Sequence, residues 1–293
     1  MRKLSLRGAA VGAALLLAAA PAALAEANVP SPNIGVRPSL ETPGSFSMIV
    51  LSDPQSYTKF AANQPLFDLQ TAWVADNIPN LNIMTALVTG DMVEQNNKLT
   101  WEGKPHPHNG NQTSRQQWQA ASRAFERLDG RLPYILCQGN HDVGYVASEN
   151  RYSMQPEFFY PERNTAWERT LVATAPDYRG INTMENAAYE FSDPNWGNIL
   201  VLAFEFAPRD EVLQWARELI DSDRFRDHRV IILTHAFLNS KGDIMQTEHY
   251  ALEPRNWPGA VWEKLVAPSR NIDLIVCGHA GRPPHFPDGA TTP

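Results

Sequence analysis

The stretch YILCQGNHD, residues 134–142, passes directly from an apolar run into a glycine and three polar residues. The run from Tyr134 to Gln138 predicts a buried strand, because short apolar runs bounded by turn residues are typical of strands. The same pattern recurs at four other places in the chain. Apolar runs over 46–51, 84–89, 230–233 and 272–277 are followed by Asp53 and Gln55, by Gly90-Asp91, by Thr234-His235 and by Gly278-His279, respectively.

Predicted helices alternate with these strands. Apolar residues recur at helical spacing over 66–78 (Leu66, Leu69, Trp73 and Ile78), 115–128, 212–220 and 260–266, and a further strand is predicted over 198–204. A polar loop over 92–114 and an aperiodic stretch over 143–186 interrupt the order, and we expect the second to pack over one face. Strands that alternate with helices indicate an α/β protein built of layered helices and sheets.

The residues that follow the five strands are metal ligands by type. In α/β proteins ligands bind beyond the carboxyl ends of the strands, so these side chains are expected to share one rim. Carboxylate oxygen, amide oxygen and neutral imidazole suit a mixed site for Zn, Mn or Fe. Two carboxylates, one Asn and two His exceed what one tetrahedral ion takes, and they favour two divalent or trivalent ions.

In this order, the motifs resemble those of the calcineurin-like metallophosphoesterases. The resemblance rests on Asp53, Gly90-Asp91, Gly139-Asn140-His141-Asp142, His235 and Gly278-His279, and it covers about residues 46–281. It implies the fold class α/β, as a four-layer β-sandwich of two mixed sheets flanked by helices. It also implies hydrolysis of a phosphate mono- or diester by a metal-bound hydroxide at a two-metal site.

The resemblance also implies a role for each residue. Asp91 bridges both metals, Asp53 and Gln55 belong to the first, and Asn140, His235 and His279 hold the second. His141 faces the phosphate-ester substrate and protonates or stabilises the leaving oxygen. Asp142 is expected to orient and charge the His141 imidazole.

Two positions depart from the family's usual motifs. Gln55 stands where the first motif has a histidine, and Gly281 stands where the last motif has its second histidine. Both missing histidines belong to the first metal. The Asp-x-Gln form is similar to an exported bacterial branch of the family. The alternative is a catalytically weakened or inactive relative that binds phosphate or another ligand.

The N-terminus has the pattern of a secretory signal peptide. Arg2, Lys3 and Arg7 precede an apolar run, and Ala23-Leu24-Ala25 forms a cleavage site, so residues 1–25 are predicted to be removed. Residues 26–45 are predicted to be a flexible linker, and residues 46–293 the phosphoesterase domain. The protein is therefore expected in the periplasm or outside the cell, without a transmembrane anchor after cleavage.

Charge and composition exclude two classes of protein. The formal net charge of −7 excludes a nucleic-acid binder that works by bulk positive charge. The hydrophobic fraction of 43% excludes wholesale disorder. The composition leaves the oligomeric state and the substrate open.

The two cysteines, Cys137 and Cys277, each end an apolar run. We favour buried free thiols over a disulfide, because a domain of this size has a sufficient core without a covalent link.

The C-terminal tail after His279 contains Pro283, Pro284 and Pro287, so it cannot form a central strand. We therefore expect the strand over 272–277 to be an under-covered sheet edge, and we hypothesise that the domain is truncated at its C-terminus.

Overall fold

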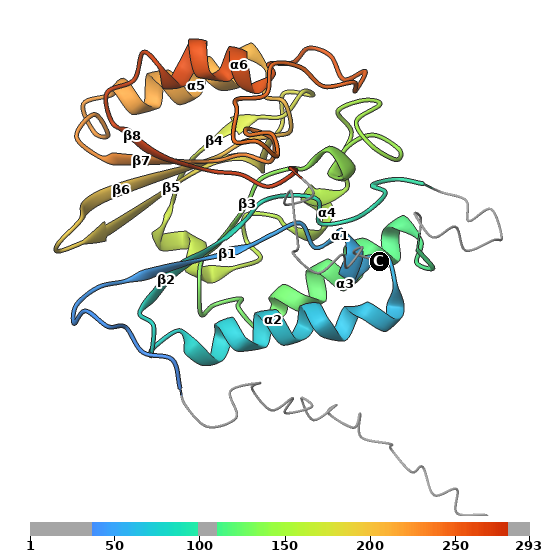
Figure 1. Cartoon of the computed structure of the whole chain (residues 1–293), viewed down its shortest axis with the longest axis horizontal. Coiled ribbons are helices and arrows are strands. Elements are labelled where there is room, and N and C mark those ends of the chain that lie inside the picture. The colour runs from blue at the N-terminus through green and yellow to red at the C-terminus, as the bar shows by residue number, and fades with distance from the viewer. Residues whose placement is uncertain (1–36, 99–109, 281–293) are drawn as a thin grey trace, which may run out of the picture. The chain divides into compact units, whose positions relative to one another are not determined.

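A computed structural model describes residues 37–98 and 110–280, which all lie in the unit Ser31–Pro293. Two sheets pack face to face, with α2 and α3 on the outer side of one and α5 and α6 on the outer side of the other (Figure 1). The predicted α/β sandwich flanked by helices is confirmed. The proposed signal peptide, most of the proposed linker, Gly281 and the proline-rich tail lie outside the described residues.

The smaller sheet has the strand order β1-β2-β3 and is parallel throughout. Its strands are β1 (Ser47–Leu51), β2 (Ile83–Val88) and β3 (Tyr134–Leu136), each within two residues of its predicted bounds. Only the larger sheet is mixed. Parallel pairing brings the carboxyl ends of the three strands to one edge. The helical elements that follow or connect them are α1 (Gln55–Thr58), η1 (Ala61–Asn63), α2 (Gln64–Asn77), α3 (Ser114–Glu126) and η2 (Asn140–Asp142).

The larger sheet has the strand order β4-β5-β6-β7-β8. Its first three strands, β4 (Leu171–Pro176), β5 (Asn182–Asp193) and β6 (Gly197–Ala203), pair antiparallel. Its last two, β7 (Arg229–Leu233) and β8 (Ile272–Val276), continue parallel to β6. The remaining helical elements are α4 (Gln155–Phe158), η3 (Thr165–Arg169), α5 (Asp210–Asp221), α6 (Pro258–Val261) and η4 (Trp262–Val266).

The aperiodic stretch 143–186 was only partly interpreted from the sequence. It includes α4 and η3, but it also contains β4 and the start of β5, which were not predicted. β5 is buried along almost its whole length, so its side chains do not alternate between apolar and polar. A strand buried on both faces lacks the period-two signal that identifies a half-exposed one.

Strand β6 separates the two cores of the sandwich. Ile199, Val201 and Ala203 face the cluster shared with the smaller sheet, whereas Leu200 and Leu202 face the cluster under α5. Successive side chains of a strand point to opposite faces, so one continuous apolar strand serves both layers.

Two long helices, α2 and α3, cover the smaller sheet. The sequence pattern predicts the buried face of α3 correctly but not that of α2. Helix α3 starts with a capping box between Thr113 and Gln116 and buries the expected residues Trp118, Ala121 and Phe125. Helix α2 is present where predicted, but its buried face carries Phe67 and Val74, and Leu66 is 50% exposed. Apolar residues occupy several faces of α2, so spacing alone did not select the inward one.

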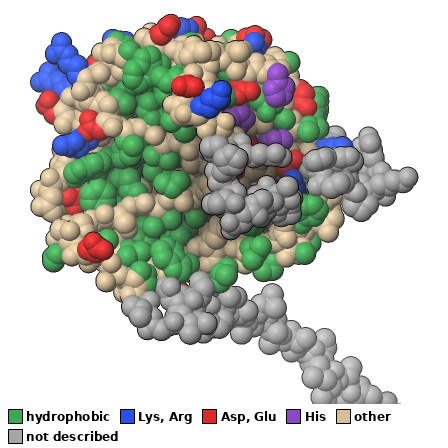
Figure 2. Space-filling view, viewed as in Figure 1, with side chains coloured by type: hydrophobic (Ala, Val, Ile, Leu, Met, Phe, Trp, Pro, Cys, Tyr) green, Lys and Arg blue, Asp and Glu red, His purple; other side chains and the backbone are tan. Residues whose placement is uncertain are grey.

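The strand before Cys277 is a sheet edge, as expected. Within the described residues β8 pairs only with β7, and β1 likewise pairs only with β2. Val50 on β1 and Leu274 on β8 are 51% and 45% exposed. Hydrophobic side chains also form patches on the face drawn in Figure 2. Cys137 and Cys277 are both free thiols, as expected, but only Cys137 is buried, and Cys277 is partly exposed.

The corrected face of α2 gives a matched pair of substitutions. Phe67→Ala should lower the free energy of unfolding by about 3–5 kcal/mol, because Phe67 is 2% exposed and its ring centroid lies 5.6 Å from that of Phe125. Leu66→Ala should change it by no more than about 0.5 kcal/mol, because this side chain is half exposed. Urea unfolding measures both, and equal losses would contradict the observed face.

Candidate metal centre

The candidate site lies where the carboxyl ends of strands from both sheets meet. Asp53 follows β1, Asp91 follows β2, Asn140 follows β3, His235 follows β7 and His279 follows β8. Histidine side chains gather at one part of the surface, apart from the main hydrophobic patches (Figure 2). The five side chains that were predicted to share one rim do lie together.

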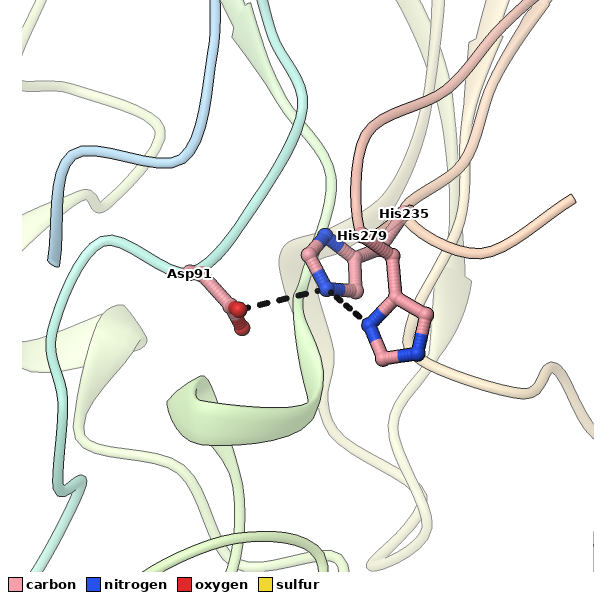
Figure 3. Close-up of side chains that lie close together, drawn as sticks. All are labelled: Asp91, His235 and His279. Carbon is pink, nitrogen blue, oxygen red and sulfur yellow. Dashed lines mark hydrogen bonds and ion pairs between the residues drawn. The ribbon is translucent and has the colours of Figure 1, made fainter. Parts of the chain in front are cut away.

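Four ligand atoms converge at the centre of this site. The Oδ1 atom of Asn140 lies 2.9 Å from Nε2 of His235 and 3.0 Å from Nδ1 of His279. The two imidazole nitrogens are 3.0 Å apart, and Nε2 of His235 is 3.3 Å from Oδ2 of Asp91 (Figure 3). Ligands of a tetrahedral zinc ion lie roughly 3.3 Å apart when each is about 2.0–2.1 Å from the ion. The atoms of Asn140, His235 and His279 are therefore spaced as ligands of a single ion, and the ligand atoms of Asp91, His235 and His279 lie within 4.8 Å of one another.

The outward nitrogens of both imidazoles face oxygen acceptors. Nδ1 of His235 lies 2.6 Å from the carbonyl oxygen of Thr89, and Nε2 of His279 lies 3.3 Å from Oε1 of Glu248. A carbonyl or carboxylate oxygen only accepts, so these two contacts favour the tautomer with the hydrogen on the outward nitrogen. In the neutral rings the inward nitrogens then present lone pairs to the site, as metal-binding histidines require.

Asp91 and His235 stabilise each other's charged forms. Burial alone would raise the pKa of Asp91, but the positive charge of His235 and its hydrogen bond lower it to about 2. Burial would lower the pKa of His235, but the charge of Asp91 raises it to about 9. A metal ion binds neutral imidazole, so it competes with the proton on His235.

The residues assigned to the first metal also lie in the site. Asp53 accepts from the Thr89 hydroxyl at 2.6 Å and from the backbone N–H of His279 at 3.0 Å. Gln55 donates from Nε2 to Oδ2 of Asp91 at 3.2 Å. Its Oε1 atom is buried without a hydrogen-bond partner among the described residues. The Gln55 amide thus turns its NH₂ group toward Asp91, and its orphaned oxygen is the atom able to bind a cation.

His141 and Asp142 do not interact as expected. The His141 backbone donates to Oδ1 of Asp91 at 3.0 Å, and its Nδ1 lies 2.8 Å from the carbonyl oxygen of Glu94. Asp142 instead accepts from the backbone N–H groups of Gly139 and Val93 at 2.8 and 3.3 Å. The prediction that Asp142 orients the His141 ring is therefore wrong, because its carboxylate is used to hold the turn and a backbone carbonyl orients the ring.

The environment of Asp142 agrees with this structural role. The residue is fully buried, and burial together with the negative charge of Asp91 raises the pKa of its carboxyl to about 8. It is thus a poor source of negative charge for the His141 imidazole near neutral pH.

Two glycines are needed because the site is closely packed. A Cβ on Gly139 would lie 2.1 Å from Oδ1 of Asp91, and a Cβ on Gly278 would lie 2.3 Å from Oδ1 of Asp53. Asp91 and His279 themselves have φ values of 50° and 65°, a left-handed conformation that non-glycine residues seldom adopt. Backbone strain of this kind concentrates at functional sites.

Several contributors were missed by the sequence analysis. Thr89 contacts both Asp53 and His235, Glu94 orients His141 through its carbonyl, and Glu248 and Tyr250 contact His279 and Asn140. Backbone carbonyls carry no side-chain signal. Glu248 and Tyr250 lie in an irregular stretch that no strand-end pattern marks.

The close approach at Gly278 is testable. Gly278→Ala should displace Asp53 and weaken metal binding by Asp53 and Gln55. The added Cβ would also lie 2.7 Å from the Thr89 hydroxyl, and no rotamer of Asp53 removes that second contact. Gly180→Asn is the control, because Gly180 has open space around it and asparagine tolerates its left-handed φ of 82°. Metal titration of both variants provides the measurement, and unchanged binding in Gly278→Ala would contradict the packing argument.

Comparisons with known proteins identify the family of the chain. The family model for calcineurin-like phosphoesterases matches residues 46–283. The uncharacterized protein YvnB of Bacillus subtilis (strain 168) is 23% identical over 236 residues, which is 80% of this chain and 15% of YvnB. The chain thus spans a small part of that relative's length. The match over the whole described sandwich, with its ligand-bearing strand ends, shows that the chain belongs to the calcineurin-like phosphoesterase family.

Proposed function

We propose that this protein hydrolyses phosphate mono- or diesters at a two-metal centre. Family membership supports phosphoester hydrolysis in general. The observation that carries the proposal is the convergence of donor atoms from Asp91, Asn140, His235 and His279, with the outward nitrogen of each imidazole facing an oxygen acceptor.

The ligands divide into two unequal sets. Asn140, His235 and His279 would hold the second metal together with Asp91, and Asp53 and Gln55 would hold the first with the same shared carboxylate. The mixed oxygen and nitrogen donors suit Mn, Fe or Zn. When bound, such ions polarise the phosphoryl group and lower the pKa of water.

The proposed task of His141 is to supply a proton to the leaving oxygen. The Glu94 carbonyl at 2.8 Å holds the hydrogen on Nδ1, so proton exchange takes place at Nε2. The backbone N–H of His141 donates to Asp91. This hydrogen bond fixes the position of the His141 backbone relative to the shared carboxylate. A general acid must lie within hydrogen-bond reach of the atom that it protonates, so these contacts support the role by fixing the position of His141.

A second candidate function is phosphate or ligand binding without turnover. It is favoured by Gln55 and Gly281, which replace two histidines of the first site. A weak first site would leave the second set able to bind a metal and a phosphate group but poor at catalysis.

We also propose that the protein is exported. The support is the basic, apolar and Ala-x-Ala pattern of residues 1–25. Among the described residues, no helix is both long and apolar enough to cross a bilayer.

Metal titration by calorimetry should show two unequal steps. The tighter step belongs to the set of four ligands made of Asp91, Asn140, His235 and His279. The weaker step belongs to Asp53 and Gln55, whose third ligand is the shared carboxylate of Asp91. Asp53→Asn should remove the weaker step and keep the tighter one. Two equal tight steps in the wild type would contradict the unequal ligand count.

Substitutions in the site test hydrolysis itself, with bis- and mono-nitrophenyl phosphates and alkyl phosphates as substrates. Asp91→Asn should abolish activity, because it removes the shared charge. His141→Ala should retain metal and lose about 10²- to 10⁴-fold in rate. The exposed Glu263→Gln serves as the unaffected control.

The dependence on the leaving group separates the possible roles of His141. The loss of rate in His141→Ala should be smaller for nitrophenyl esters than for alkyl esters, because nitrophenolate leaves without a proton. Equal losses across both series would exclude His141 as the acid. Metal binding without turnover of any phosphate ester would favour the binding function instead.

A further inference from the structure

One irregular segment outside the recognised motifs contacts two of the ligands of the second metal site. We call residues 244–256 the rim segment. It begins at Ile244, which forms an isolated bridge with Leu238, and it ends just before α6. Glu248 and Tyr250 are its two side chains that reach the ligands.

Tyr250 fixes the orientation of the Asn140 amide. The Nδ2 atom of Asn140 donates to the Tyr250 hydroxyl at 2.9 Å, which leaves Oδ1 facing His235 and His279. An amide binds a cation only through its oxygen, so a flipped Asn140 would present an NH₂ group to the metal. The hydrogen bond to the hydroxyl therefore stabilises the observed orientation, which is the one that can ligate.

Glu248 fixes the tautomer of His279. Its carboxylate lies 3.3 Å from Nε2 of His279, and both side chains are largely buried, at 14% and 15% exposure. A buried carboxylate holds the hydrogen on Nε2 and keeps the Nδ1 lone pair directed at the other ligands. Without it either tautomer of His279 is open, and one of them cannot bind a metal.

The rim segment is itself firmly anchored. Arg151 donates from Nε to the carbonyl of Pro254 at 3.1 Å, and Asn256 donates to the carbonyl of Pro208 at 2.9 Å. Leu252 is 1% exposed within a small apolar cluster that includes Phe206. The Phe206 ring also contacts the Tyr250 ring, with centroids 5.6 Å apart. The segment can therefore hold Glu248 and Tyr250 in place before a metal arrives.

We propose that the rim segment presets the second metal site, with Glu248 and Tyr250 as positioning residues for His279 and Asn140. This inference rests on the metal centre of the proposed function. His235 does not depend on the segment, because the backbone carbonyl of Thr89 holds its outward nitrogen. The rim segment thus positions two of the four ligands of the second metal, His279 and Asn140.

Calorimetric titration of the full chain with Mn²⁺ or Zn²⁺ tests the proposal. Glu248→Ala and Tyr250→Phe should each weaken the tighter step by about 10- to 100-fold, the usual effect of losing an outer partner of a ligand, and leave the weaker step unchanged. Glu248→Gln should recover part of the loss, because an amide oxygen still accepts a hydrogen bond. Tyr250→Phe keeps the aromatic packing on Phe206.

Two exposed residues supply matched controls. Glu263→Gln matches Glu248→Gln, and Tyr160→Phe matches Tyr250→Phe, but both residues are exposed. Neither control should change the tighter or the weaker binding step. Thermal unfolding of every variant shows whether a loss of affinity comes from a loss of structure. A weakened tighter step in a variant that unfolds at the wild-type temperature supports the role of that residue in positioning a ligand.

Nitrogen-15 spectra of the histidines give a readout that a purely structural role would not change. In the metal-free wild type, His279 should show the Nε2–H tautomer, and Glu248→Ala should shift it toward a tautomer mixture, whereas Tyr250→Phe should not. An unchanged His279 signal in Glu248→Ala overturns the role of Glu248.

The outcomes separate this inference from the proposed function. Wild-type affinity in both Glu248→Ala and Tyr250→Phe overturns the inference even if the enzyme hydrolyses phosphate esters. A weakened tight step in both variants supports it even if no phosphate ester is hydrolysed, in which case the proposed hydrolysis fails alone. A wild-type chain that binds neither Mn²⁺ nor Zn²⁺ overturns both.

Discussion

The buried carboxylate of Asp91 is the constraint around which the site is organised. An ionised carboxylate without partners inside a protein costs several kcal/mol, so it must be surrounded by donors and positive charge. Here the donors come from the His141 backbone, the Gln55 amide and the His235 ring. These groups follow β3, β1 and β7, so satisfying one charge requires the carboxyl ends of strands from both sheets to meet.

Such close convergence leaves no room for a side chain at two positions in the turns. Gly139 and Gly278 face the carboxylates of Asp91 and Asp53 at distances that exclude a Cβ atom. The left-handed backbone of Asp91 and His279 is a further cost of the same geometry. Extensive burial in the two cores on either side of β6 offsets this strain. The fold can thus hold a site that would be unfavourable by itself.

The inner ligands depend on partners that hold them from outside. The carbonyls of Thr89 and Glu94 and the carboxylate of Glu248 each face the outward nitrogen of one histidine. These contacts decide which nitrogen faces the site, and a metal or a substrate can use only that nitrogen. The chemistry of the site therefore rests as much on backbone atoms and on an irregular segment as on the motif residues.

The sequence by itself determined the α/β class, the strands that carry the motifs and the set of ligand types at their ends. These features are local, because an apolar run followed by glycine and a polar residue specifies both a strand and its functional end. Only the tertiary structure decided that Phe67 rather than Leu66 faces the core, that Glu94 rather than Asp142 orients His141, and that β4 and β5 complete the sheet. Each of these depends on which distant segment supplies the neighbouring surface or hydrogen-bond partner, and spacing along one segment does not contain that information.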